Sequence, residues 1–170
     1  MAQPLTLYKL IVLYMLDKVT FPLSNSQISE FILDREYTSY FHLQQALFEL
    51  ADAKLVEIET VRNTSYYHLT EEGSTTLSYF STEIPSAIKE EIEFFLTEKG
   101  CELQKKFTTL ADYYKASSQE YTVRCQVKEK ATSLIDMTIS VPSQEAAETI
   151  CNNWEQKYEE IYSHIMETLL

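Results

Sequence analysis

One stretch, residues 24–73, constrains the fold of this chain more than any other part of the sequence. It opens with Ser24 and Gln27, whose spacing is that of a capping box, in which two side chains bind free amides at a helix start. The apolar residues that follow at helical spacing predict a short helix with one buried face; they are Ile28, Phe31 and Ile32. A polar turn over residues 34–37 is expected to end this helix.

A second helix is expected after the turn, and Thr38 is placed to cap it. Its apolar residues recur at helical spacing and predict an inward face made of Leu43, Ala46, Leu47 and Leu50. The opposite face is predicted to be exposed, and it comprises Ser39, Tyr40, His42, Gln44, Gln45 and Glu49.

Residues 56–61 then alternate apolar and polar side chains, which predicts a half-buried strand. Residues 62–65 have turn chemistry, and a returning strand is expected from Tyr66 to Leu69 before Thr70 caps a further helix. Two helices, a tight link and a two-stranded hairpin, in this order, predict a winged helix-turn-helix. The alternative is a small α/β unit without a helix that faces a groove.

The segment before this stretch is expected to complete the same domain. Residues 5–16 are strongly apolar but too few to span a bilayer, and Lys9 interrupts them. We therefore expect a buried first helix, with Pro4 in its first turn, and no signal peptide. The link that ends at Leu23 is expected to supply a small strand beside the hairpin. The winged-helix domain is thus predicted to cover residues 1–80.

Residues 81–170 are predicted to form a second domain for dimerisation or sensing. A helix is expected from about Ser86 to Gly100, because glycine favours a helix C-terminus. Strand-like runs at residues 102–114, 121–128 and 134–141 predict a three-stranded antiparallel meander with one apolar face. A long amphipathic helix closes the chain. The predicted class is α+β: a winged helix-turn-helix, then a helix, the meander and the C-terminal helix.

The apolar stripe of the last helix needs a surface to cover. The apolar face of the meander is the first candidate, and another copy of the chain is the second. The residues expected at a homodimer interface are Trp154, Tyr158, Ile161, Tyr162 and Ile165.

The charge of the chain counts against strong binding to nucleic acid. The formal net charge is −12, with five basic and ten acidic residues over 1–80 and nine basic and sixteen acidic over 81–170. Phosphate contacts normally dominate the affinity for nucleic acid. An acidic winged helix is expected to bind weakly, to bind as a dimer through a small positive patch, or not to bind.

Other function classes find little support. Two glycines leave no glycine-rich phosphate loop. The spacing of His, Cys and carboxylate residues predicts no metal site, cofactor or catalytic pair, so we expect no enzyme. Three cysteines without a CxxC pair or a secretory leader predict reduced, buried thiols in a cytoplasmic protein: Cys101, Cys125 and Cys151.

The candidate DNA contacts lie on the second helix of the pair and on the hairpin. Glutamine can read adenine with two hydrogen bonds, and Ser, Thr and Tyr hydroxyls can reach phosphate. The predicted contact residues are Thr38, Ser39, Tyr40, His42, Gln44, Gln45, Arg62, Asn63 and Tyr66. Each could instead be ordinary surface or pack locally.

Several segments together resemble a known family across nearly the whole chain: KLIVLYMLDKV, FPLSNSQISEFIL, YTSYFHLQQALFEL, YYHLTEEG, IPSAIKEEIEFFL, ADYYK and ICNNWEQKYEEIYSHI. The chain is similar to uncharacterised bacterial proteins grouped as a domain of unknown function and described as predicted winged-helix transcriptional regulators. The resemblance implies a DNA-binding regulator and supplies no catalytic or ligand residues.

Two functions remain open. The first is a homodimeric transcriptional regulator that binds double-stranded DNA through the winged helix. The second is a winged helix that binds a protein partner through exposed Tyr40, Phe41 and Phe48 and does not bind DNA. No membrane is expected as a partner.

Overall fold

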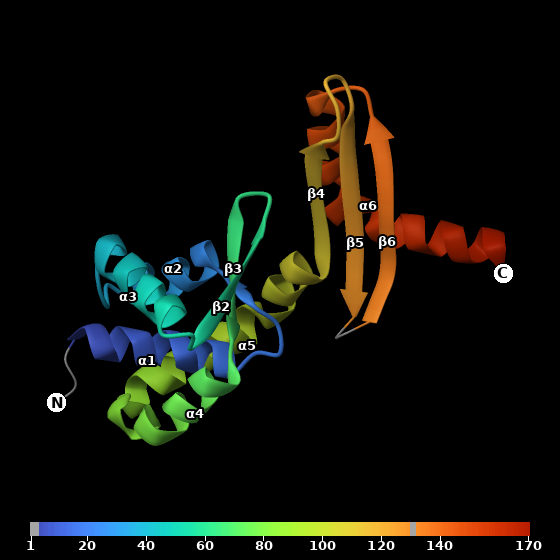
Figure 1. Ribbon diagram of the computed structural model, residues 1–170. Helices are drawn as coiled ribbons and strands as arrows, with labels where there is room; N and C mark the ends of the chain where they lie inside the picture. Colours follow the sequence, from blue (N-terminus) through green and yellow to red (C-terminus); the bar gives the residue numbers. More distant parts are fainter. Residues whose placement is uncertain (1–3, 130–131) are drawn as a thin grey trace. The chain divides into compact units, whose positions relative to one another are not determined.

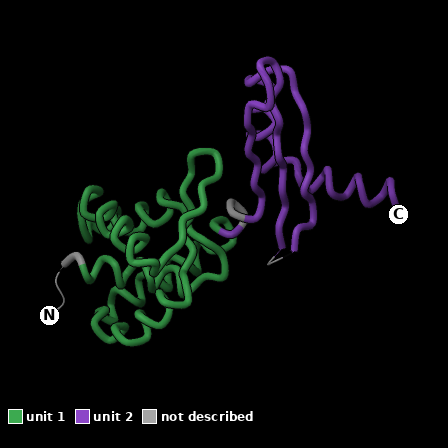
Figure 2. Tube along the Cα trace, in the orientation of Figure 1, with its two compact units in different colours: residues 1–103 green, residues 104–170 purple. Residues whose placement is uncertain are grey.

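The computed structural model describes residues 4–129 and 132–170, apart from the side chains of residues 4, 5 and 105–107. The chain divides into two compact units, residues 1–103 and 104–170, which Figure 2 colours separately. The described residues form six α-helices and two three-stranded antiparallel sheets (Figure 1), which confirms the predicted α+β class. No described helix has both the length and the apolar character needed to cross a bilayer.

The first unit is built around α1 (Pro4–Asp17), the apolar helix predicted over residues 5–16. All seven side chains from Leu10 to Leu16 are buried, and the most exposed of them, Tyr14, is only 8% exposed. A helix that is apolar around its circumference must be covered on all sides. Here α3 (Tyr40–Asp52), α4 (Glu71–Phe80) and β3 (Thr64–Leu69) pack against it.

The caps of α2 (Asn25–Asp34) and α3 explain where these helices begin. The predicted capping box of α2 is confirmed: the Ser24 amide donates to Gln27 Oε1 at 2.8 Å, and the Gln27 amide donates to Ser24 Oγ at 3.2 Å. The cap of α3 is Ser39 and not Thr38, because Ser39 Oγ accepts the amide hydrogen of His42. Thr38 lies one residue before the cap.

The first sheet has the strand order β1-β3-β2, with β1 (Leu23–Ser24), β2 (Val56–Val61) and β3. The short strand expected at Leu23 is confirmed, since Leu23 pairs with Tyr67. The turn between β2 and β3 is shorter than predicted, because Thr64 already pairs with Val61. Its two residues, Arg62 and Asn63, have φ values of 48° and 63°. Two positive φ values are the mark of a type I′ turn, whose twist suits a hairpin.

Both α2 and α3 end with a left-handed residue that is not glycine. Glu36 has φ 54° and Lys54 has φ 60°. After α2, the amides of Glu36 and Tyr37 donate to the carbonyls of residues 33 and 32, and after α3, Lys54 and Leu55 donate in the same pattern to residues 51 and 50. Each is a Schellman motif, which satisfies the last carbonyls of the helix.

Gly73 brings α4 against the link that follows α3. A Cβ atom at Gly73 would lie 2.1 Å from the carbonyl oxygen of Leu55. The same carbonyl accepts the amide and the hydroxyl of Thr70, at 3.2 and 2.9 Å, and Thr70 also caps α4 as predicted. Glycine is therefore required here for close approach.

The helix after α4 is longer than the sequence predicted. After a short 3₁₀ turn, η1 (Ser81–Glu83), α5 runs from Ser86 to Thr108 and passes through Gly100 without a left-handed residue. The helix continues because Leu103 is buried in the first core, seven residues after buried Leu96. The first strand of the meander therefore begins at Thr109 and not near residue 102.

Because α5 packs in the first core, the division between the units lies later in the chain than the predicted boundary. Ile92, Phe95 and Leu96 are buried in the same core as α1. Phe31 of α2 packs on Phe95, with ring centroids 5.2 Å apart. The compact units consequently divide at residues 103 and 104, whereas the predicted boundary at residues 80 and 81 assigns α5 to the second domain.

The second unit is the predicted meander covered by the predicted long helix. Its strands are β4 (Thr109–Lys115), β5 (Tyr121–Glu129) and β6 (Thr132–Val141), in the order β4-β5-β6. The helix α6 (Gln144–Leu169) begins at Ser143, whose side chain caps it. The core between them comprises Ala111, Val123, Cys125, Val127, Ala147, Cys151 and Trp154. The link between the second and third strands is expected at residues 130–132; Thr132 already belongs to β6, and residues 130 and 131 lie outside the described residues.

Candidate nucleic-acid interface

The helix α3 packs into the core through its inner face. The predicted inward stripe is confirmed: Leu43, Ala46, Leu47 and Leu50 are each at most 1% exposed. Much of the outer face is open: Ser39 and His42 at its start are exposed, whereas Gln44 and Glu49 are half-buried. The Ser39 hydroxyl lies 3.1 Å from His42 Nδ1, so the cap also orients the imidazole ring.

The outer side of α3 carries three exposed aromatic rings. Phe41 is 74% exposed, Phe48 is 70% exposed and Tyr40 is 60% exposed. Because Phe41 and Phe48 are seven residues apart, they lie on the same side of the helix. The helix sequence, YFHLQQALFELAD, contains no Lys or Arg. The face can therefore stack and bury apolar surface, but it cannot itself neutralise phosphate.

Gln44, a predicted DNA contact, is bound within the chain. Its amide accepts a hydrogen bond from Asn25 Nδ2 at 2.8 Å and donates to Asn25 Oδ1 at 3.0 Å. Asn25 Nδ2 also donates to the Tyr67 hydroxyl at 3.3 Å. This reciprocal amide pair fixes α2 against α3, so Gln44 orients the helix and has little freedom to read a base.

Gln45 belongs to a second polar chain that runs to α1. Its side-chain amide donates to Glu49 Oε1 at 3.1 Å, and Glu49 forms an ion pair with Lys9. The hydrogen bonds from Lys9 and then Gln45 lower the pKa of Glu49. Glu49 is thus a carboxylate whose charge is largely matched inside the unit. Gln45 is exposed and faces the same side as Phe41 and Phe48.

The hairpin tip presents Arg62 and Asn63, which are both exposed. Tyr66, another predicted contact, requires a correction. It is only 8% exposed and pairs with Ser24 on one side and Glu59 on the other, so its side chain has little surface to offer DNA.

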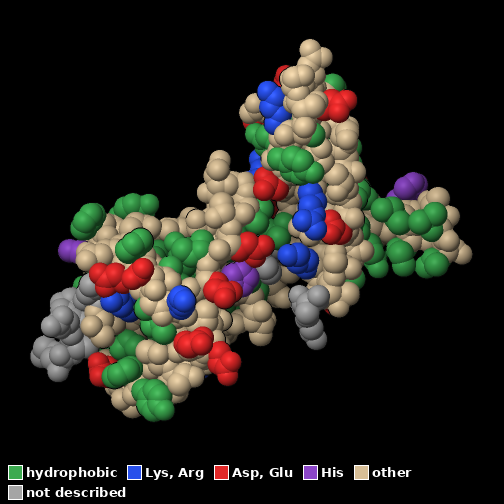
Figure 3. Space-filling model, in the orientation of Figure 1, with side chains coloured by type: hydrophobic (Ala, Val, Ile, Leu, Met, Phe, Trp, Pro, Cys, Tyr) green, Lys and Arg blue, Asp and Glu red, His purple; other side chains and the backbone are tan. Residues whose placement is uncertain are grey.

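Most cations of the first unit lie beside carboxylates. The ion pairs join Lys9 to Glu49, Lys18 to Glu93, Arg35 to Glu91 and Lys99 to Glu30. Figure 3 shows the same mixture of basic and acidic side chains on the face that it draws. The hollow between α3 and β2 is lined by one cation, Lys54, and two carboxylates, Glu57 and Glu72, among its residues. These surfaces predict a weak attraction for phosphate.

The five residues expected at a dimer interface differ in their surroundings. Trp154 requires a correction: it is 2% exposed, and its Nε1 donates to the Gln126 carbonyl of its own sheet at 3.1 Å. It is a core residue and cannot offer its ring to a second chain. The other four remain half-exposed: Tyr158, Ile161, Tyr162 and Ile165.

The cysteines and histidines offer no second site. Cys125 and Cys151 are buried as expected, whereas Cys101 is exposed on α5 and departs from the expectation. Burial, with the neighbouring Cys151 thiol, raises the pKa of Cys125 to about 11, which keeps it a thiol at neutral pH. Among the described residues, no three His, Cys, Asp or Glu side chains gather as metal ligands would.

Comparison with known proteins gives one family. Residues 8–169 match the family described as Domain of unknown function (DUF4364). The chain belongs to this family. No curated protein and no solved structure matches it. Family membership therefore covers both units and names no activity for either.

Two features around α3 were missed in the sequence. The Asn25–Gln44 pair joins residues 19 apart, and the partly exposed Lys9–Glu49 pair joins α1 to α3. Neither has a local signal, because such pairs depend on how helices pack. The order of α1, α2 and α3 could suggest that these polar residues approach one another, but not which atoms meet.

Proposed function

We propose that the chain is a transcriptional regulator of the cytoplasm that binds double-stranded DNA as a homodimer, through a winged helix in its first 80 residues. The observation that supports it best is the order α1, β1, α2, α3, β2, β3, α4, with the inner stripe of α3 buried and the side that carries Phe41, Gln45 and Phe48 exposed. In helix-turn-helix proteins the second helix of the pair enters the major groove. Here α2 and α3 form the pair, and β2 and β3 form the wing.

The outer face of α3 supplies the base contacts in this proposal. Gln45 exchanges its bond to Glu49 for two hydrogen bonds to an adenine edge, and His42 reaches the neighbouring base. Phe41 and Phe48 contact thymine methyl groups, which apolar side chains can recognise.

The start of α3 and the wing tip supply the backbone contacts. The first amides of a helix favour an anion, and the Ser39 and Tyr40 hydroxyls, with Thr38 just before them, lie at this end. Arg62 and Asn63 contact a second phosphate from the wing. Lys54, at the other end of α3, adds a cation.

The small number of cations sets a quantitative expectation. With Arg62 and Lys54 from each of two chains, about four phosphates are neutralised, and the slope of log K against log salt is about −3.5. This is shallow for a DNA-binding protein, so binding is expected to depend on the shape and apolar contacts of α3 more than on charge.

The test is an anisotropy titration of the full chain against duplexes from the DNA upstream of its own gene, at two salt concentrations. Arg62→Ala is expected to make the salt slope of the dimer about 2 less steep, because two phosphate contacts are lost. Gln45→Ala is expected to weaken the preferred duplex by about 1–3 kcal/mol and to leave other duplexes unchanged.

The matched control is Tyr79→Ala on α4, which removes a ring that is 76% exposed outside the proposed interface. Its DNA binding should equal that of the wild type. Absence of binding by the wild type at low salt, or equal effects of all three variants, contradicts the proposal.

A second function is favoured by one observation, the pair Phe41 and Phe48 on a helix without Lys or Arg. A winged helix with this face fits a protein partner that buries both rings, because aromatic anchors dominate protein interfaces. If DNA binding is absent, or indifferent to salt and to Arg62→Ala, this function replaces the first.

A further inference from the structure

We propose that β6 is the dimer interface: the β6 strands of two copies pair antiparallel, and the second half of each α6 covers the joint. This inference takes from the proposed function only that the chain works as a pair, and it does not require DNA binding.

The strand β6 is the edge of its sheet and the least covered of its three strands. Its inner row is Ile135, Met137 and Ile139, and Ile139 is 36% exposed, whereas its cross-strand neighbour Val123 is 0% exposed. Edge strands of monomers are usually protected by lysine, proline or short length. Here β6 has ten residues, TSLIDMTISV, without any Lys, Arg or Pro.

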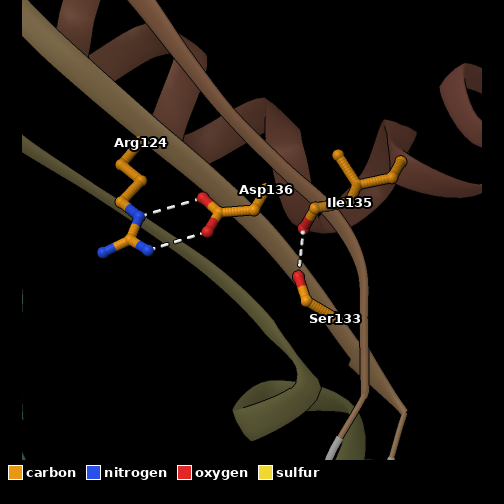
Figure 4. A network of polar contacts seen from close by, with 4 residues as sticks. All are labelled: Arg124, Ser133, Ile135 and Asp136. Carbon is orange, nitrogen blue, oxygen red and sulfur yellow. Dashed lines mark hydrogen bonds and ion pairs between the residues drawn. The ribbon is translucent and has the colours of Figure 1, made fainter.

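The one charge of β6 is already matched within its own sheet. Arg124 of β5 holds Asp136 with two parallel hydrogen bonds, from Nε at 2.9 Å and from the terminal nitrogen at 2.7 Å (Figure 4). This ion pair lies on the face away from α6. It leaves an edge that carries no net charge from these two groups and does not repel a second copy.

The helix α6 crosses the sheet and continues beyond it. Glu148 accepts a hydrogen bond from Tyr113 of β4 at 2.9 Å, and Trp154 donates to Gln126 of β5 at 3.1 Å. Past Trp154 no side chain of α6 is fully buried: Tyr158 and Ile161 still pack against the core of their own sheet, and the apolar stripe continues to Leu169, which is 77% exposed. Figure 1 shows this second half of α6 running on past β6.

A second copy fits both uncovered surfaces at once. Trp154, the last fully buried residue of α6, is hydrogen-bonded to Gln126, and Gln126 pairs with Asp136 near the middle of β6. In the proposed dimer α6 therefore leaves the sheet close to the twofold axis. Each α6 then reaches over the inner row of the partner's β6, and the two helices meet beside the axis. Such a contact is isologous and closes after two copies.

The strand register is self-complementary. With Met137 at the twofold axis, Ile135 faces Ile139 of the second copy, and Asp136 faces Thr138. Because opposite residues share a face in antiparallel pairs, both inner rows stay on the side of α6. In this register no like charges lie opposite each other. If Asp136 lay on the axis instead, the carboxylates of the two copies would be directly opposite and would repel.

The size of the surface also fits. The ten residues of β6 and about twelve residues of α6, from Tyr158 to Leu169, fall within the roughly 20–30 residues per side of a standard interface. The other edge, β4, has seven residues, and its inner-row Ala111 is only 9% exposed. The edge at β6 is therefore the better interface.

The test is the solution mass of the full chain across a range of concentrations. The wild type should have twice the chain mass of 19.8 kDa. Ile139→Glu should weaken dimerisation at least 100-fold and give a monomer, with the helix content unchanged by circular dichroism. The matched control is Tyr114→Glu, at a side chain that is 58% exposed on β4 of the same sheet, and it should remain a dimer.

A cross-link provides the second readout. In a Cys101→Ser, Cys125→Ala background, which removes the thiol of β5 that lies opposite residue 137, Met137→Cys should form a disulfide-linked dimer under mild oxidation, and Tyr114→Cys should not. A monomeric wild type, a dimeric Ile139→Glu variant, or equal cross-linking at both positions overturns the interface. Because these outcomes are read without DNA, failure of DNA binding with a confirmed β6 dimer removes the proposed function and leaves the interface.

Discussion

The two units of this chain bury their apolar side chains to different degrees. In the first unit, α1 is covered on every side, and Ile11, Val12 and Met15 are 0% exposed. In the second unit, the last fully buried side chain of α6 is Trp154; Tyr158 and Ile161 still pack against the core but are only half-buried, and the end of the helix is exposed. The first unit therefore has a closed core around α1, whereas the second leaves a strand edge and the end of a helix exposed, which is what the proposed β6 dimer would cover.

This difference separates two kinds of stability. A closed core should unfold at the same denaturant concentration whatever the protein concentration, while a unit completed by a second copy gains stability by mass action. The sole tryptophan, Trp154, lies in the second unit. Tryptophan fluorescence therefore reports on the second unit, and circular dichroism reports on both.

The largest effect is expected from Phe31→Ala in the first core. Phe31 is 0% exposed and packs on Tyr37 and Phe95, at centroid distances of 5.8 and 5.2 Å. The cavity should cost about 4 kcal/mol of unfolding free energy. The control is Phe94→Ala, whose side chain is 63% exposed, and it should cost little. Urea unfolding at two protein concentrations should show the same loss; a loss that depends on concentration contradicts a closed first unit.

In the second unit, Trp154→Ala should cost about 3 kcal/mol, from the lost ring volume and the lost hydrogen bond to Gln126. Trp154→Phe keeps most of the volume and should cost less than half as much. For the wild type, the fluorescence transition should move to higher urea as the protein concentration rises. A transition that stays fixed over a 100-fold range would show that the second unit is complete by itself.

The two glycines give opposite predictions, both within the first unit. Gly73→Ala places a Cβ atom against the Leu55 carbonyl at 2.1 Å and should destabilise by about 2–3 kcal/mol. At Gly100 nothing lies within 4 Å, and α5 is helical there, so Gly100→Ala should stabilise by about 0.5–1 kcal/mol. Thermal unfolding of both variants measures the difference. Equal effects would contradict the close contact of α4 with the link after α3.

Gly100 also shows why the sequence misleads at some positions. Its local preference predicts a helix end, but burial of Leu96 and Leu103 in the first core carries the helix onward. The order of elements, the capping box at Ser24 and the last helix were predictable because their signals are local. The boundary at residues 103 and 104 was not, since it depends on which core α5 joins.

The same limit applies to the candidate sites. The inner and outer faces of α3 follow from spacing, so Gln45, Phe41 and Phe48 could be assigned to the surface. The partners of Gln44 and Tyr66 could not, because Asn25 and Ser24 approach them only through folding. The spacing of Trp154 also suited an interface anchor, but its part of the α6 stripe packs on its own sheet, where Trp154 donates to the Gln126 carbonyl.

The loss of unfolding free energy at alkaline pH should also come from the first unit. Burial, followed by the hydrogen bond to Glu93 at 2.6 Å, raises the pKa of Tyr14 from 10.0 to about 12. A raised folded-state pKa contributes stability that is complete below pH 10.0 and is lost as the pH rises toward about 12. The loss should be up to about 2 kcal/mol.

Tyr14→Phe is the matched variant for this prediction, since it keeps the ring and removes the phenol. Its unfolding free energy should vary less between pH 10.0 and about 12 than that of the wild type. Spectrophotometric titration should show one fewer late-ionising tyrosine. An unchanged pH dependence would show that the Tyr14–Glu93 contact does not stabilise the closed core.

The smallest effect concerns backbone strain, which also differs between the units. Among the described residues, every non-glycine residue with positive φ lies in the first unit: Glu36, Lys54, Arg62 and Asn63. A closed core can hold such residues because its packing determines the backbone around them.

Glu36→Gly should stabilise the first unit by about 1 kcal/mol, because glycine adopts the left-handed conformation without the Cβ penalty. Glu36→Ala keeps the Cβ atom and removes the charge, so it should give no gain. If both variants stabilise the first unit equally, the effect is electrostatic. If neither variant does, the Schellman turn after α2 is free of strain, and the positive φ values of the first unit cost less free energy than expected. In either case the fluorescence transition of the second unit should not move, since Trp154 reports a core that these variants do not touch.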